Sequence, residues 1–188
     1  MTIRPERPEE FPAIHRLVEE AFRTAKVSDG KEQDFTDRLR AAGGYIPSLA
    51  LVAEEEGRLI GHTMLTRTTL RDGTPVLLLA PLSVVLDCRS RGIGAALVRE
   101  ALRRAYGREE QAVVLVGDPA YYGRFGFRRS TELGIRNTNG IPDEYVQVLE
   151  LVPGALAGTH TTIASKSHEN HLHRPQLRGL HRQTVPRN

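Results

Sequence analysis

A basic, glycine-containing turn between an apolar run and an amphipathic segment is the feature that most constrains this chain. Val76 to Leu86 is a long apolar run with β-branched residues toward its end, which is typical of a central strand covered on both faces. After Gly94, apolar residues recur at helical spacing as far as about Arg104. Between the two lies Arg89-Ser90-Arg91-Gly92-Ile93-Gly94-Ala95. The sequence therefore predicts a buried strand, a basic turn and a helix start.

Such a turn is suited to bind a pyrophosphate. Backbone N–H groups at a helix start lack intrahelical partners and can receive an anion, and glycines let it approach the main chain without meeting a Cβ. Arg89 and Arg91 add positive charge. A dinucleotide fingerprint would need a small residue where Leu97 stands, and no Lys-Ser/Thr pair follows the glycines as in a P-loop. Taken alone, the glycines are also compatible with a tight turn that serves only packing.

The rest of the chain alternates between helical and strand patterns. Periodicity predicts helices over about Pro8–Phe22 and Lys31–Ala42, and strands over Thr2–Arg4, Leu49–Ala53, Arg58–Arg67, Ala112–Val116 and Tyr145–Leu151. A short helical turn opens at Asp118-Pro119 and stops at Gly126.

Size and composition indicate one soluble domain. The chain has 188 residues, of which 39% are hydrophobic and 26% charged, and it shows no apolar run of membrane-spanning length. No apolar stretch of signal-peptide length follows the N-terminus, and the single Cys excludes an internal disulfide and a CxxC zinc site. We therefore expect a cytoplasmic, metal-free enzyme or binding protein.

The basic charge is concentrated near the C-terminus. Residues 159–188 hold five Lys or Arg and one Glu, and subtracting them from 26 and 23 leaves 21 basic against 22 acidic residues in 1–158. The predicted domain is residues 1–158, followed by a disordered, His-rich basic tail over 159–188. The body gives no reason to expect nucleic-acid binding, and the tail has no Tyr, Phe or Trp on which bases could stack.

Two motifs resemble the GNAT superfamily of N-acetyltransferases. Arg89-x-x-Gly92-x-Gly94, after the strand ending at Leu86, is similar to its acetyl-CoA signature, and Ala120-Tyr121-Tyr122-Gly123-Arg124-Phe125-Gly126-Phe127 is similar to its aromatic-Tyr-x-x-x-Gly-Phe motif. The second follows the first by about thirty residues, in the order expected of the superfamily. The resemblance covers about residues 2–151. The block from Gly117 further resembles the branch of predicted N-acetyltransferases that includes YhbS.

This resemblance implies a GNAT α/β fold, a mixed but mostly antiparallel sheet flanked by helices and splayed between its fourth and fifth strands. The implied co-substrate is acetyl-CoA. Its pantetheine arm would pair with the strand backbone in the splay, and its pyrophosphate would take the N–H groups of the turn. The implied cofactor-binding residues are Leu82, Ser83, Val84, Arg89, Arg91, Gly92, Ile93, Gly94 and Ala95.

Tyr122 falls on the superfamily's tyrosine that faces the thioester sulfur. A phenol has a pKa near 10 and a thiol near 8.5, so full proton transfer to the thiolate is uphill by about 2 kcal/mol. Tyr122 is therefore expected to donate a hydrogen bond to the departing sulfur. No Asp or Glu stands on the strand from Val76 to Leu86, so His62, Glu54 to Glu56 and a water relay stay open as the base. Cys88 neighbours the phosphate turn, which disfavours it as an acyl-carrying nucleophile.

The predicted function is transfer of an acetyl group from acetyl-CoA directly to an amine, and the alternative is an acyl-CoA-binding or sensing module with little turnover. The acceptor is not assigned, and a homodimer is left open. No membrane or nucleic-acid partner is expected. Superfamily members continue to one more strand after the region of Leu156, whereas this chain turns polar from Thr159.

Overall fold

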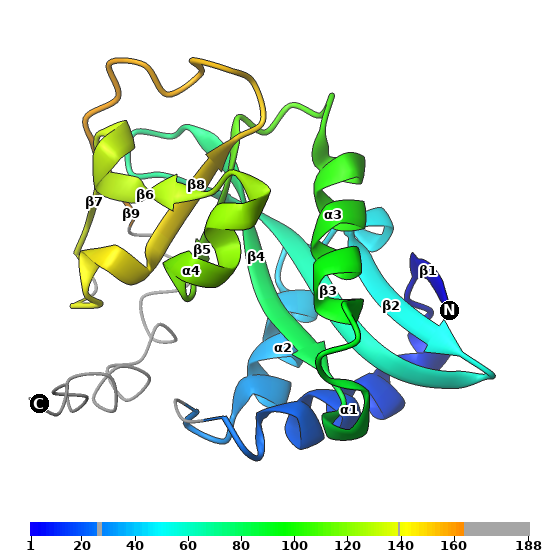
Figure 1. Cartoon of the computed structure of the whole chain (residues 1–188). Coiled ribbons are helices and arrows are strands. Elements are labelled where there is room, and N and C mark those ends of the chain that lie inside the picture. The colour runs from blue at the N-terminus through cyan, green and yellow to red at the C-terminus, as the bar shows by residue number, and fades with distance from the viewer. Residues whose placement is uncertain (26–27, 139, 164–188) are drawn as a thin grey trace, which may run out of the picture.

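The computed structural model describes residues 1–25, 28–138 and 140–163. A seven-stranded sheet with the order β1-β2-β3-β4-β5-β8-β6 forms its centre, and β7 and β9 form a separate pair (Figure 1). The strands are β1 (Thr2–Pro5), β2 (Ala50–Glu55), β3 (Arg58–Thr69), β4 (Pro75–Val84), β5 (Ala112–Val116), β6 (Arg128–Arg129), β7 (Ile135–Asn137), β8 (Val146–Glu150) and β9 (Thr161–Ile163). The α-helices are α1 (Phe11–Phe22), α2 (Glu32–Ala41), α3 (Ile93–Ala105) and α4 (Pro119–Tyr122).

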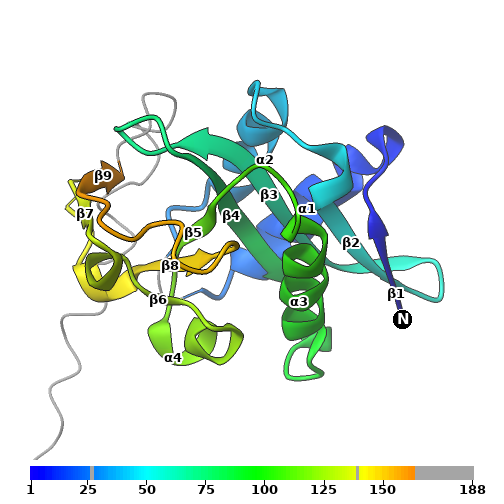
Figure 2. The ribbon, with the colours of Figure 1, turned by 90° about the horizontal axis from the view of Figure 1, so that it is seen from above.

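Helices cover both faces of the first four strands. Figures 1 and 2 show α1 and α2 on one face and α3 on the other. Each helix buries the stripe that its periodicity predicts: α1 through Ile14, Leu17, Val18 and Ala21, and α3 through Ile93, Leu97, Val98, Ala101, Leu102 and Ala105. The main core therefore lies in two layers, above and below β2, β3 and β4.

The sheet opens between β4 and β5. The pairs β1–β2, β2–β3 and β3–β4 are antiparallel, and β5 pairs with β8 in the same way. The parallel β4–β5 pairing is limited to Val76–Leu78 with Ala112–Val114, although β4 continues to Val84. The predicted mixed, mostly antiparallel sheet with a splay between the fourth and fifth strands is confirmed. The edge of β4 that faces the splay is left without a strand partner among the described residues.

Three short strands were not predicted: β6, β7 and β9. Each has two or three residues, too few for alternation to be visible in the sequence. Strand β9 lies inside the stretch 159–188 for which the sequence predicts a tail, and it pairs in parallel with β7. One strand therefore does follow Leu156. The remainder of that predicted tail, 164–188, lies outside the described residues.

Candidate functional site

A pocket of about 610 Å³ lies where β4 leaves β5, between the start of α3 and the end of α1. Its volume is within the range of small-molecule sites. Of the nine predicted cofactor-binding residues, all but Arg91 line it. The structure therefore brings together the strand end and the turn that the sequence singled out. The other lining residues are Ala21, Phe22, Ala25, Cys88, Ser90, Tyr121 and Arg124.

The start of α3 offers free backbone donors to this pocket. Gly92 is the N-cap residue and has a φ of 79°, a left-handed conformation that favours glycine. The first helical hydrogen bond runs from Ala96 N to Gly92 O. In the described structure, the N–H groups of residues 91–95 have no acceptor. Together with the positive end of the helix dipole, they form a site suited to an anion.

Gly94 keeps the floor of this site open. A Cβ placed at Gly94 would lie 2.9 Å from the hydroxyl of Tyr121 and 3.7 Å from side-chain atoms of Leu82 and Val84. The first of these distances is closer than a real Cβ tolerates, so a side chain here would displace Tyr121. The glycine therefore leaves room for the Tyr121 hydroxyl of α4 at the start of α3.

The two arginines of the turn are held by the protein itself. Arg89 donates to the hydroxyl of Thr24 at 3.0 Å and to the carbonyl of Ala21, which ties the turn to the end of α1. Arg91 donates to both carboxylate oxygens of Glu55, at 2.9 and 2.8 Å, and so turns away from the pocket. The expectation that both guanidinium groups supply charge to the pocket is not met for Arg91, whose predicted contact is through its backbone N–H.

Arg124 also lines the pocket, and the sequence did not predict this cation. Its guanidinium carbon lies 4.2 Å from the centroid of the Tyr121 ring, and its Nε donates to the Tyr121 carbonyl at 2.8 Å. No carboxylate pairs with Arg124 in the described part of the chain. A signal was present: Tyr121 and Arg124 are three residues apart, a spacing that places two side chains on one face of a helical turn.

Tyr122 does not line this pocket. Its ring packs edge-on against Tyr121, with centroids 4.9 Å apart, and against Phe127 at 5.9 Å. It also covers Gly117 at the end of β5, where a Cβ would lie 2.3 Å from the ring. Burial raises the pKa of the Tyr122 phenol, which therefore stays protonated at neutral pH.

The carboxylates considered as bases have other partners or lie elsewhere. Glu54 accepts from Arg4 at 2.9 and 2.5 Å, and Glu55 is paired with Arg91. Glu56 is in the turn between β2 and β3, with a φ of 50°. None of the three lines the pocket.

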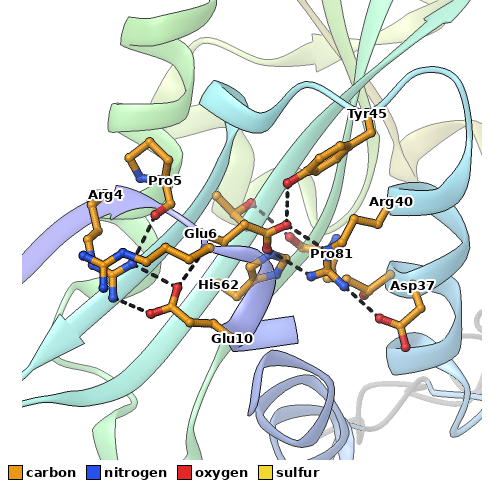
Figure 3. A network of polar contacts seen from close by, with 12 residues as sticks. Arg4, Pro5, Glu6, Glu10, Asp37, Arg40, Tyr45, His62 and Pro81 are labelled. Carbon is orange, nitrogen blue, oxygen red and sulfur yellow. Dashed lines mark hydrogen bonds and ion pairs between the residues drawn. The ribbon is translucent and has the colours of Figure 1, made fainter. Parts of the chain in front are cut away.

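His62, which the sequence left open as a base, is fully buried in a polar network shown in Figure 3. Its Nε2 lies 2.9 Å from Glu6 Oε2. Glu6 also accepts from Arg40 Nε at 2.7 Å and from the Tyr45 hydroxyl at 2.9 Å. Burial opposes ionisation of Glu6, but the hydrogen bonds from His62 and Arg40 outweigh it and lower its pKa to about 2. Burial lowers the pKa of His62, against the opposing hydrogen bond to Glu6.

Among the described residues, every helix is too short or too polar to span a membrane. Within the same residues, no three His, Cys, Asp or Glu side chains lie close enough together to hold a metal ion.

Comparison with known proteins identifies the family of this chain. The family model described as "Acetyltransferase (GNAT) domain" matches residues 2–130. The uncharacterized N-acetyltransferase YhbS of Escherichia coli (strain K12) is 31% identical over 175 residues, which cover 90% of this chain and 99% of YhbS.

Two solved structures extend the likeness to three dimensions. The E. coli YhbS structure, in complex with CoA, has a TM-score of 0.80 and 28% identity, over 92% of this chain and 93% of that one. A GNAT family acetyltransferase from Brucella melitensis, in complex with acetyl-CoA, has a TM-score of 0.68 and 34% identity, over 81% of this chain and 88% of that one.

Proposed function

Because the chain belongs to the GNAT acetyltransferase family, we propose that it binds acetyl-CoA in the pocket at the start of α3 and transfers the acetyl group directly to an amine. The observation that carries this proposal is the pocket itself, which joins free N–H groups at a helix start to an open strand edge. The relatives in complex with CoA and acetyl-CoA support the same co-substrate.

In this proposal the diphosphate lies on the N–H groups of residues 91–95, with Arg124 as the neighbouring cation. The pantetheine arm then runs along the open edge of β4. Val85 N donates to Ile60 O on β3, and alternation along the strand therefore turns the N–H of Val84 toward the splay. An amide or thioester oxygen of the ligand is positioned to accept from Val84, as from an added strand.

The chemistry needs three supports. The attacking amine must be neutral, the tetrahedral oxyanion must be stabilised, and the departing thiolate must be stabilised as the C–S bond breaks. The Val84 N–H is a preorganised donor for the oxyanion, and one such donor is worth roughly a hundredfold or more in rate. Tyr122 is the donor to the departing sulfur, because its raised pKa keeps the phenol protonated.

A second function, an acyl-CoA-binding or sensing module with little turnover, is favoured by one observation. Strand β4, Pro75–Val84, carries no Asp or Glu that could deprotonate the amine. The two functions share the pocket and differ in turnover.

The test is release of free thiol from acetyl-CoA across a panel of primary amines that includes amino acids, polyamines, aminoglycosides and peptide N-termini. Acetyl transfer predicts thiol release that depends on one class of amine and on the protein. If CoA binds but no amine accelerates thiol release, the sensing module is the correct function. If CoA does not bind, both are wrong.

A further inference from the structure

Three buried side chains, Ser83, His62 and Glu6, follow one another from the pocket into the core, and we propose that they form a relay that takes up the amine proton during acetyl transfer. This inference rests on the proposed function, and it supplies the base that β4 lacks. Ser83 would touch the reacting amine, while His62 and Glu6 act through it.

Strand register brings the first two residues together. His62 on β3 is the direct partner of Ser83 on β4, so their side chains share one face of the sheet and lie as cross-strand neighbours. Ser83 is 2% exposed and lines the pocket, and His62 is completely buried. The hydroxyl that borders the ligand site is thus adjacent to an imidazole that solvent does not reach.

Both residues have an unused polar atom. Neither Oγ of Ser83 nor Nδ1 of His62 has a hydrogen-bond partner among the described residues, although both atoms are buried. Leaving a buried polar group without a partner costs about 1–3 kcal/mol, so such atoms in a native core call for an explanation. Two of them on neighbouring residues beside a ligand pocket suggest a path that is completed when substrate is present.

The hydrogen bond to Glu6 determines which nitrogen of the His62 ring carries the proton. The ionised carboxylate accepts, so Nε2 of His62 holds the proton and Nδ1 presents a lone pair. The Ser83 hydroxyl can donate a hydrogen bond, and the Nδ1 lone pair can accept one. Burying His62 in the neutral form leaves it able to accept a proton.

The surrounding charges hold the relay in this state. Glu6 comes from the segment after β1, Arg40 and Asp37 from α2, and Tyr45 from the segment after α2 (Figure 3). Arg40 Nη1 donates to Asp37 Oδ1 at 2.8 Å, and its Nε and Nη2 donate to Glu6 at 2.7 and 3.0 Å. Arg40, Tyr45 and His62 therefore fix the Glu6 carboxylate, which can stabilise an imidazolium without moving.

The step balances within the ternary complex. The amine nitrogen bonds to the thioester carbon, its proton moves to Ser83 Oγ, and the Ser83 proton moves to His62 Nδ1. The C–S bond then breaks, its electron pair stays on sulfur, and the proton held by His62 returns through Ser83 to the thiolate. The products are the acetylated amine and free CoA thiol.

The experiment compares Ser83→Ala with a matched control, Thr66→Val. Thr66 is also a buried hydroxyl on β3 without a partner among the described residues, but it does not line the pocket. With acetyl-CoA and the amine that gives the fastest thiol release, Ser83→Ala is expected to lower kcat by about a hundredfold or more, the usual worth of general-base catalysis. The relay also predicts that the wild-type kcat falls on the acid side as His62 is protonated, and that Ser83→Ala lacks this fall. Thr66→Val should change neither.

A spectroscopic arm tests the coupling without turnover. In ¹⁵N spectra of the full chain with CoA and the amine bound, a complex that cannot turn over, the Nδ1 resonance of His62 is expected to shift and titrate differently in Ser83→Ala and to stay in place in Thr66→Val. An unchanged Nδ1 resonance in a folded Ser83→Ala variant would overturn the relay. The relay would also be overturned if Ser83→Ala had the same kcat and the same pH profile as the wild type. Absence of thiol release by the wild type would instead overturn the proposed function, and the relay with it.

Discussion

The Nε2 atom of His62 lies 2.9 Å from the Glu6 carboxylate in a part of the core that is closed to solvent. Through Arg40, the same carboxylate is linked to α2. These contacts join the segment after β1, strand β3 and helix α2. A buried ion of this kind is costly to leave unpaired, so its protonation should affect stability.

Stability is expected to fall with acid in two stages. The His62 pKa is lowered by burial, so below about pH 6.5 the unfolded chain takes up a proton that the folded chain refuses. The Glu6 pKa falls from its ordinary 4.5 to about 2, so its contribution is present above pH 4.5 and is lost as pH falls toward 2. That contribution is of the order of 3 kcal/mol. Urea denaturation at several pH values measures both stages. Glu6→Gln should be less stable at pH 7 and flatter between pH 4.5 and 2, and an equally steep slope in this variant would contradict the assignment.

Arg124 and Arg91 should differ in their effect on CoA affinity. Arg124 lines the pocket without a carboxylate partner among the described residues, whereas Arg91 is paired with Glu55 outside it. Arg124→Gln is expected to weaken CoA binding by about tenfold, or about 1.4 kcal/mol, with a smaller salt dependence than the wild type. Arg91→Gln is the control and should bind nearly as well as the wild type. Calorimetric titration with CoA decides, and a larger loss in Arg91→Gln would reverse the assignment.

The two tyrosines of α4 should separate rate from affinity. Tyr122→Phe removes the proposed donor to the departing sulfur and is expected to lower kcat by roughly tenfold to a hundredfold, while CoA affinity is retained. Tyr121→Phe removes a hydroxyl beside Gly94 and should mainly weaken CoA binding. Steady-state kinetics and calorimetry on both variants make the comparison. Loss of affinity without loss of kcat in Tyr122→Phe would assign Tyr122 to packing.

Strand β9 should set the shortest stable chain. Arg71 N donates to Thr162 O at 3.1 Å, and Asp72 N donates to the Thr161 hydroxyl at 3.2 Å, so β9 holds the turn after β3. We expect a chain ending at residue 158 to melt several degrees below the full chain, because it loses about 1–2 kcal/mol of stability. A chain ending at residue 163 is expected to melt at the same temperature as the full chain. Both should bind CoA, because none of the described residues after Arg124 lines the pocket. Equal melting temperatures for the two truncations would show that β9 adds no stability.

The sequence predicted the long elements well because their patterns are strong. The stripes of α1 and α3, the apolar run of β4 and the turn that begins at Arg89 each carry a local signal that the structure confirms. The pairing of the turn with the end of β4 also followed, since these segments are adjacent in the chain.

The features that were missed depend on residues far apart in sequence. The interaction of His62 with Glu6 spans 56 positions, and only the register of β3 with β4 places His62 beside Ser83. The ion pair that holds the Arg91 guanidinium on Glu55, away from the pocket, likewise depends on the turn between β2 and β3. No periodicity reports such contacts. Arg124 could have been found from its helical spacing to Tyr121, whereas the two- and three-residue strands could not.

Titration of the full chain with CoA and acetyl-CoA by calorimetry tests the central claim most directly, that free N–H groups at the start of α3 hold the CoA diphosphate. The wild type is expected to bind one equivalent. Gly94→Ala should bind at least about tenfold more weakly, because the new methyl group meets Tyr121 on the pocket floor. The control Gly43→Ala, where a Cβ meets nothing within 4 Å, should bind like the wild type. No binding by folded wild-type protein, or equal affinities for all three, would contradict the account.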